Sequence, residues 1–221
     1  MHATSDGHVV VLHDPDVDRT TDGSGPVRTM TLAQLQALDA GWQHRAPDGS
    51  HPHRGKGIVV PTLDALLAAH PGVPLNIEIK QDEPAIEAAV LAVLDRHGAR
   101  RQTLLAAEHS RIGTRIRAAA PDMLTSFSAE EVADFVGRLR ENRWEGYVPP
   151  AVALQVPPAW DGMEIVTTPF LEAAHRFELE VHVWTVNQPV EMHRLLELGV
   201  DGLITDLPAV AMEVMRRRRL R

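Results

Sequence analysis

Apolar runs alternate with amphipathic segments along nearly the whole chain. Short apolar runs of the kind that form buried strands predict strands at residues 8–14, 74–80, 103–108, 123–127, 152–157, 180–187 and 202–206. Apolar residues at the three- and four-residue spacing of a helix predict helices at 61–70, 83–98, 110–121, 128–142, 169–178 and 189–199. This alternation of strands and helices indicates an α/β fold with a parallel sheet.

Two of the predicted helices carry a start signal. Thr62 stands directly before "LDALL", and Ser128 stands before Glu130 and Glu131. Hydroxyl side chains at such positions accept hydrogen bonds from the free N–H groups of the first helical turn. We therefore expect a helix to begin just after each of them.

Two parallel-sheet architectures fit the alternation. A doubly wound sheet would carry a glycine-rich phosphate turn, but neither G-x-G-x-x-G nor G-x-x-x-x-G-K-[ST] occurs. A (β/α) barrel instead places polar residues at the carboxyl ends of its strands. The predicted strands end in HD, EIK, AEH, TSF, TVN and ITD, a pattern that favours the barrel.

Composition narrows the classes of function. The chain has 221 residues, 44% of them hydrophobic, and a formal net charge of −8, which argues against nucleic acid as a partner. It contains no cysteine, so disulfides and thiolate metal sites are excluded. No apolar run reaches the ~20 residues of a membrane helix, and the amino terminus does not resemble a signal peptide. We expect a cytoplasmic location.

Residues 41–62 form a long segment rich in Gly, Pro and His. It contains His44, His51 and His53, but no carboxylate completes a ligand spacing, so a flexible surface loop is favoured over a metal cluster. At the other end of the chain, the run "RRRRLR" follows a helical pattern. A solvated tail is the favoured interpretation, and an anion-binding tail is the alternative.

The strand predicted at 74–80 carries the most informative chemistry. Side chains alternate along a strand, so Glu78 and Lys80 share one face while Ile77 and Ile79 take the other. A central parallel strand is buried on both faces, and burying these charges is costly unless they are paired or bind something. Either a structural ion pair or a metal and phosphate site fits, with Glu78 as the oxygen ligand and Lys80 facing the anion.

Polar and aromatic residues end two other predicted strands. His13 follows four apolar residues, where its imidazole could serve general acid–base chemistry across a pocket mouth. Trp184 could form either core or the wall of a glycerol-sized subsite. Asp206 is interpreted as a helix-capping or barrel-closing residue.

Six segments in order resemble the glycerophosphodiester phosphodiesterase family, in its bacterial cytoplasmic form. They read "DGHVVVLHDPDVDRTTDGSGPV", "TLAQLQALDAG", "IVVPTLDALL", "LNIEIK", "HVWTVN" and "GVDGLITDLP", and the resemblance runs from residue 1 to about residue 210. It implies a single (β/α)8 TIM-barrel domain over 1–221 with a small insertion around 15–61. It also implies hydrolysis of glycerophosphodiesters to an alcohol and sn-glycerol 3-phosphate, in lipid and glycerol metabolism.

The same resemblance assigns residues and a cofactor. His13 matches a catalytic histidine, Lys80 an active-site lysine, Glu78 a metal ligand and Trp184 an aromatic residue near the substrate. The implied cofactor is a divalent cation, Mg²⁺ or Ca²⁺. In the family mechanism the 2-hydroxyl of the substrate attacks phosphorus, two histidines exchange a proton and the metal offsets charge.

The amino-terminal end departs from the family pattern. Family members carry an H-R-G and an E-x-D before the segment that here reads "HATSDG", so we expect a barrel that lacks its first strands, with about six barrel strands and impaired activity. The "HRG" at 53–55 follows no apolar strand and is not expected to be catalytic.

Two other functions remain open at this point. The chain could be a catalytically inactive barrel remnant that binds an anionic ligand or a partner subunit. It could also be a different phosphodiesterase on the same barrel, such as a phospholipase, although no apolar membrane-facing segment supports this. The sequence gives no indication of the oligomeric state.

Overall fold

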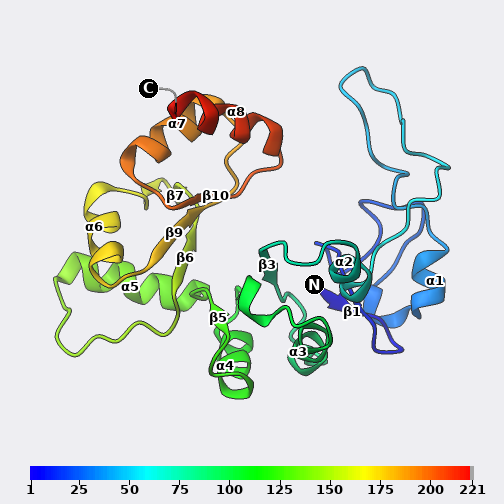
Figure 1. Ribbon diagram of the computed structural model, residues 1–221, viewed down its shortest axis with the longest axis horizontal. Helices are drawn as coiled ribbons and strands as arrows, with labels where there is room; N and C mark the ends of the chain where they lie inside the picture. The colour runs from blue at the N-terminus through cyan, green and yellow to red at the C-terminus, as the bar shows by residue number, and fades with distance from the viewer. Residues whose placement is uncertain (220–221) are drawn as a thin grey trace. The chain divides into compact units, whose positions relative to one another are not determined.

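The computed structural model describes residues 1–219, so the last two residues of the predicted basic tail lie outside the described residues. The chain divides into two compact units, residues 1–124 and the residues from Thr125 onward. In Figure 1 the first unit runs from blue to green and the second from green to red.

The first unit contains an antiparallel hairpin and a parallel strand pair. The hairpin consists of β1 (His2–Ala3) and β2 (Val9–Val10). The parallel pair consists of β3 (Leu75–Glu78) and β4 (Thr103–Ala106). The boundary between the two units falls inside β5 (Leu124–Thr125).

Backbone hydrogen bonds also fix β1 against β3. The amino group of Met1 donates to the carbonyl oxygen of Glu78 at 2.6 Å, and the backbone N–H of Lys80 donates to the carbonyl oxygen of Met1 at 3.3 Å. In a parallel pair of strands, the N–H and the C=O of one residue bond to two residues of the neighbouring strand that are two positions apart. The register therefore places His2 beside Lys80, on the same face as Glu78.

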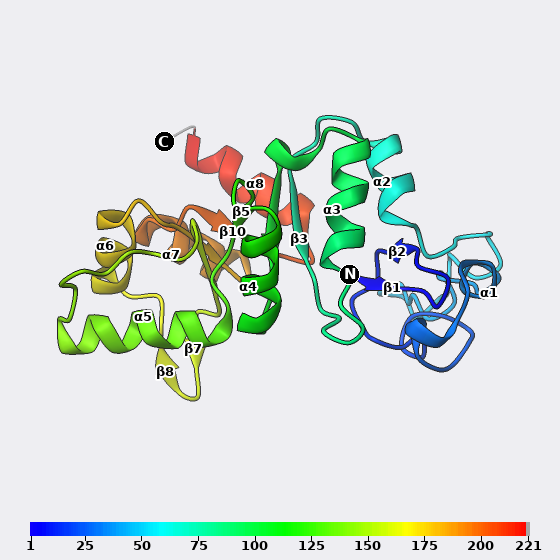
Figure 2. The same cartoon turned by 90° about the horizontal axis from the view of Figure 1, so that it is seen from below.

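The first unit also contains α-helices and short 3₁₀-helices. They are η1 (Val27–Thr29), α1 (Leu32–Gln36), α2 (Leu63–Ala69), α3 (Glu87–Arg96), η2 (Arg100–Gln102) and α4 (Ser110–Ala119). Ile77 and Ile79 of the β3 segment are 3% and 0% exposed and belong to one core cluster with residues of α2, α3 and α4. Figure 2 shows α2 and α3 side by side in this unit.

The second unit is built around three parallel strands. They are β6 (Ala153–Val156), β9 (Glu180–Val183) and β10 (Gly202–Leu203), in the order β10-β9-β6. Its helices are α5 (Ala129–Glu141), α6 (Thr168–Arg176), α7 (Pro189–Leu198) and α8 (Pro208–Arg219). Phe135 and Phe170 meet edge to face in its core, with ring centroids 5.6 Å apart. A separate hairpin joins β7 (Ala159–Trp160) to β8 (Met163–Glu164).

Every predicted strand and helix is present, although each strand is shorter than predicted. Both predicted caps are confirmed: the side chain of Thr62 accepts from Ala65 N–H, and Ser128 forms a capping box with Glu131. Neither α1 nor the β7–β8 hairpin was among the predicted elements. Within residues 1–219 no sheet closes on itself.

A helix that crosses a bilayer needs about 20 predominantly apolar residues. No helix among residues 1–219 is long and apolar enough to do so.

Candidate active site

Glu78 and Lys80 form an ion pair on one face of the β3 segment. Lys80 Nζ lies 2.8 Å from Glu78 Oε2, and the side chains of Lys80 and Glu78 are 23% and 36% exposed. The predicted alternation is confirmed, because Ile77 and Ile79 are buried on the opposite face. The predicted burial of both charges is wrong, because this face of the strand is partly open to solvent.

His13 belongs to a chain of three polar side chains after β2. Its Nδ1 lies 2.7 Å from Asp14 Oδ1, and Arg19 donates to both oxygens of Asp14 at 2.5 and 3.2 Å. The hydrogen bonds from Arg19 and then from His13 lower the pKa of Asp14 to about 2. An ionised carboxylate only accepts, so the ring of His13 donates through Nδ1 and leaves Nε2 open. The side chain of His13 is 71% exposed.

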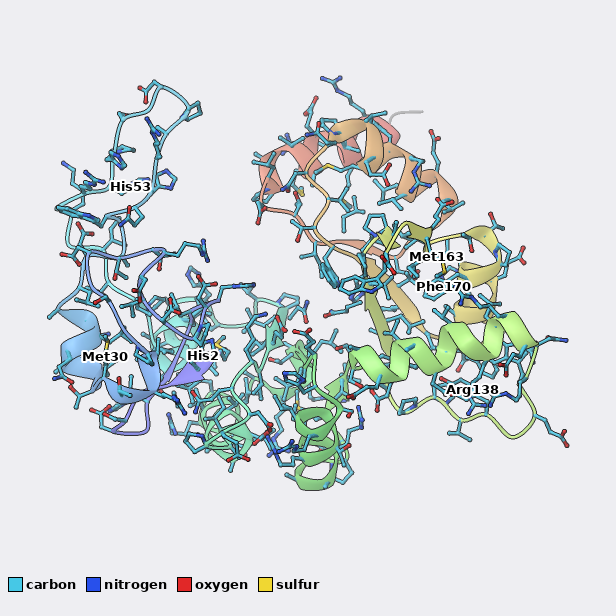
Figure 3. The ribbon with its side chains drawn as sticks, turned by 180° about the vertical axis from the view of Figure 1, so that it is seen from behind. His2, Met30, His53, Arg138, Met163 and Phe170 are labelled. Carbon is cyan, nitrogen blue, oxygen red and sulfur yellow. The ribbon has the colours of Figure 1, made fainter. Side chains whose placement is uncertain are left out.

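His2 is a buried polar residue that the sequence reasoning missed. It is 4% exposed, and its Nε2 lies 3.1 Å from the carbonyl oxygen of His13. Burial lowers the pKa of His2 below its ordinary value, against the opposing effect of that hydrogen bond, and the nearby charges of the Met1 amino group and of Lys80 lower it further. A two-residue strand has no detectable period, so only the register against β3 indicates which way this side chain points. Figure 3 shows His2 on β1.

A cavity of about 320 Å³ adjoins this group. Its lining residues are His2, Pro15, Asp16, Pro26, Arg28, Lys80, Gln81, Asp82 and Glu83. Gln81 is buried and accepts from the N–H of Ala3 while donating to the carbonyl oxygen of Pro84. It therefore holds β1 beside the segment that follows Lys80.

Trp184 lies in the second unit, directly after β9, and is 38% exposed. Three residues further along, Asn187 donates from Nδ2 to Asp206 Oδ2 at 2.8 Å and accepts from the N–H of Asp206 at 3.0 Å. These two bonds connect the segment after β9 to the segment after β10. Asp206 thus joins strand ends, and α8 begins two residues later.

The His-rich loop is held by local contacts. The rings of His44 and His53 have centroids 4.6 Å apart, and Nδ1 of His51 lies 2.9 Å from the carbonyl oxygen of His44. Arg54 lies over the ring of Trp42 at 4.5 Å. Figure 3 shows His53 in this loop.

The described residues do not fit a complete divalent-cation site. Nowhere within residues 1–219 do three or more His, Asp or Glu side chains gather so that they could hold a metal ion, and this includes the His-rich loop. Hard cations such as Ca²⁺ take six to eight oxygen ligands. Glu78 supplies one carboxylate, and Lys80 already pairs with it.

Comparison with known proteins gives one consistent result. The model of the "Glycerophosphoryl diester phosphodiesterase family" matches residues 1–210. A glycerophosphodiester phosphodiesterase of Bacillus subtilis strain 168 is 30% identical over 235 residues, which cover 94% of this chain and 72% of the relative.

Two solved structures share the fold at lower identity. The glycerophosphoryl diester phosphodiesterase domain of a Mycobacterium tuberculosis protein superposes with a TM-score of 0.78 at 22% identity, over 98% of this chain and 85% of that one. An Oleispira antarctica phosphodiesterase, solved in complex with the product sn-glycerol-3-phosphate, gives 0.75 at 21% identity, over 97% and 82%.

Proposed function

This chain belongs to the glycerophosphoryl diester phosphodiesterase family, a family of phosphoric diester hydrolases, and we propose that it hydrolyses glycerophosphodiesters to an alcohol and sn-glycerol 3-phosphate. One observation carries the proposal: Lys80, beside Glu78 on one face of a strand, lines a cavity of about 320 Å³. The product bound to the Oleispira antarctica relative supports the same substrate class.

Lys80 is proposed to hold the phosphate of the diester. Its ammonium is a compact cation that reaches the cavity, and such a charge stabilises the negative charge that gathers on phosphoryl oxygens during transfer. The ion pair with Glu78 keeps the ammonium on this face of the strand.

His13 is proposed to carry the proton. In the overall reaction the bond between phosphorus and the alcohol oxygen breaks, a water oxygen ends on phosphorus, and the alcohol leaves with a proton. Asp14 holds Nδ1 of His13, so Nε2 is the ring nitrogen that can exchange that proton.

Mg²⁺ or Ca²⁺ remains the cofactor predicted by the resemblance, with Glu78 as its predicted ligand. Because the described residues gather no site for it, no step of the proposed reaction is routed through a cation.

Trp184 is proposed to contact the glycerol part of the substrate, as the resemblance implies. The two units are proposed to form one barrel-type domain over 1–221, with the insertion around 15–61. The cytoplasmic location and the role in lipid metabolism stay predictions.

One observation favours a second candidate function. Glu78 is already neutralised by Lys80, and the described residues offer no group of three metal ligands. An inactive relative that binds an anionic ligand would need only the cationic side chains of the cavity, Lys80 and Arg28.

Release of sn-glycerol 3-phosphate from glycerophosphocholine separates the two functions. We expect the purified chain to release it in the presence of Mg²⁺ or Ca²⁺, and Glu78→Gln to reduce the rate at least ~10-fold, as loss of one electrostatic contact in a site does. The matched control is Glu172→Gln, an exposed carboxylate on α6. Binding of glycerol 3-phosphate without turnover would favour the inactive relative.

A further inference from the structure

We propose that His2 is a positioning residue of this site, which holds His13 in place through the main-chain carbonyl of His13. The inference rests on the proposed function, in which His13 carries a proton. It adds a histidine that lies outside the set expected from the sequence.

The register of β1 brings His2 to the site. The amino group of Met1 bonds to Glu78, and the carbonyl oxygen of Met1 accepts from Lys80, so Met1 lies opposite the residue between them. The next residue, His2, therefore lies beside Lys80. His2 is 4% exposed, and it lines the same cavity as Lys80. A polar ring this deeply buried is expected to be hydrogen-bonded, and His2 is.

The direction of the hydrogen bond follows from its partner. A carbonyl oxygen only accepts, so Nε2 of His2 must carry the proton that it shares with the carbonyl oxygen of His13 at 3.1 Å. This bond joins residues eleven apart, across the β1–β2 hairpin. It fixes the backbone at the point from which the imidazole of His13 projects.

His13 is thereby held at two places. His2 holds its main chain, and Asp14, itself fixed by two bonds from Arg19, holds Nδ1 of its ring. The ring is 71% exposed, so little packing restrains it. Because misplacement of a reacting group by about 1 Å can cost ~100-fold in rate, these two tethers set where Nε2 meets the substrate.

Three variants test the inference by kinetics. We expect His2→Ala to lower kcat about 10- to 100-fold while KM for glycerophosphocholine changes less than about threefold, since the phosphate contact of Lys80 remains. His2→Gln keeps a side-chain N–H donor and should recover most of the lost kcat. The control is His8→Ala, an exposed histidine of the same hairpin. Equal kcat in His2→Ala and His8→Ala overturns the inference.

A second measurement does not depend on activity. In protein labelled with ¹⁵N-histidine, the ring signals of His13 should shift or broaden in His2→Ala and stay in place in His8→Ala and His2→Gln. If the His13 signals are unchanged in His2→Ala, the positioning role is wrong, whatever the chain hydrolyses. If they change in a chain that hydrolyses no diester, the positioning role stands and the proposed function fails.

Discussion

Two neighbouring side chains of the site have lowered pKa values for opposite physical reasons. The pKa of Asp14 falls to about 2 because hydrogen bonds from Arg19 and His13 favour its charged form. The pKa of His2 falls because burial disfavours its charged form. The first shift therefore stabilises the fold at neutral pH, and the second makes the fold sensitive to acid.

The carboxylate gives the first pH prediction. A depressed acidic pKa contributes stability above the unfolded value of 3.8, and that stability is lost as pH falls toward about 2. We expect the free energy of unfolding of Asp14→Asn to lie below that of the unmodified chain at pH 6, and the gap to close between pH 4 and 2. Urea unfolding across this range measures it, and a constant gap would contradict the assignment.

The buried imidazole gives a second prediction in a different pH window. Below its ordinary pKa of 6.5, His2 takes up a proton more readily in the unfolded chain than in the folded one, so stability decreases as pH falls through 6.5. His2→Gln should make the free energy of unfolding less dependent on pH just below 6.5, compared with His8→Ala. The same slope in both variants would show that His2 is not shifted.

At the scale of elements, the sequence predicted well whether a segment forms a strand or a helix, but it predicted poorly where each strand begins and ends. The periods of 2 and 3.6 identify strands and helices, whereas pairing partners decide where a strand stops, as at β2 after Val10. The β7–β8 hairpin had a usable signal in Asp161-Gly162, whose φ values of 49° and 74° suit a two-residue type I′ turn. The position of His2 and the cavity had no such signal in the sequence, because both depend on the register between β1 and β3.

One helix start gives a direct stability prediction. Ser128 is 1% exposed and caps α5, where its Oγ accepts from the N–H of Glu131. We expect Ser128→Ala to lower the free energy of unfolding by about 1 kcal/mol, the usual cost of losing such a cap. Ser24→Ala, at an exposed loop serine, is the control and should be neutral in the same urea titration. A neutral Ser128→Ala would mean that the cap contributes nothing.

A second element-scale contact fixes the segment after Lys80. Arg115 on α4 bonds to Asp82 Oδ1 at 2.7 Å and, through Nε, to Glu87 Oε1 at 2.8 Å, and the side chain of Glu87 is 6% exposed. Arg115→Ala leaves that carboxylate buried without a partner, which should cost about 2 kcal/mol or more in unfolding free energy. Arg111→Ala removes an exposed pair and should cost less than about 1 kcal/mol. Similar losses of unfolding free energy in both variants would show that the bonds from Arg115 to Asp82 and Glu87 contribute no more than an exposed ion pair.

At the scale of the whole molecule, the family match and the fold of the solved structures agree with each other. The described residues nevertheless gather no site for the metal that the family resemblance implies. The family model spans residues 1–210, and solved relatives superpose at TM-scores of 0.75 to 0.78. The six motifs in order were enough to indicate the family from the sequence. A cation site needs several oxygens in one place, and no set of three or more ligands is found in residues 1–219.

Cation binding can be tested without measuring enzymatic turnover. The resemblance implies that Glu78 binds a cation, but the structure pairs Glu78 with Lys80 and supplies no further ligands among residues 1–219. From the structure we therefore expect millimolar Mg²⁺ or Ca²⁺ to leave the melting temperature of the chain unchanged, since a ligand stabilises a fold only in proportion to its occupancy. A saturable rise in melting temperature that disappears in Glu78→Gln would show that the pair opens to bind a cation.

The central claim is that the cluster around Lys80 hydrolyses glycerophosphodiesters. The chain has two lysines, and Lys56 lies exposed in the His-rich loop, so the two substitutions form a matched pair. The most direct measurement is ³¹P NMR of glycerophosphocholine incubated with the unmodified chain, Lys80→Ala and Lys56→Ala. We predict conversion to sn-glycerol 3-phosphate by the unmodified chain and Lys56→Ala, and a rate at least ~100-fold lower for Lys80→Ala. Equal rates in the two variants, or no conversion by any of the three, would contradict the account.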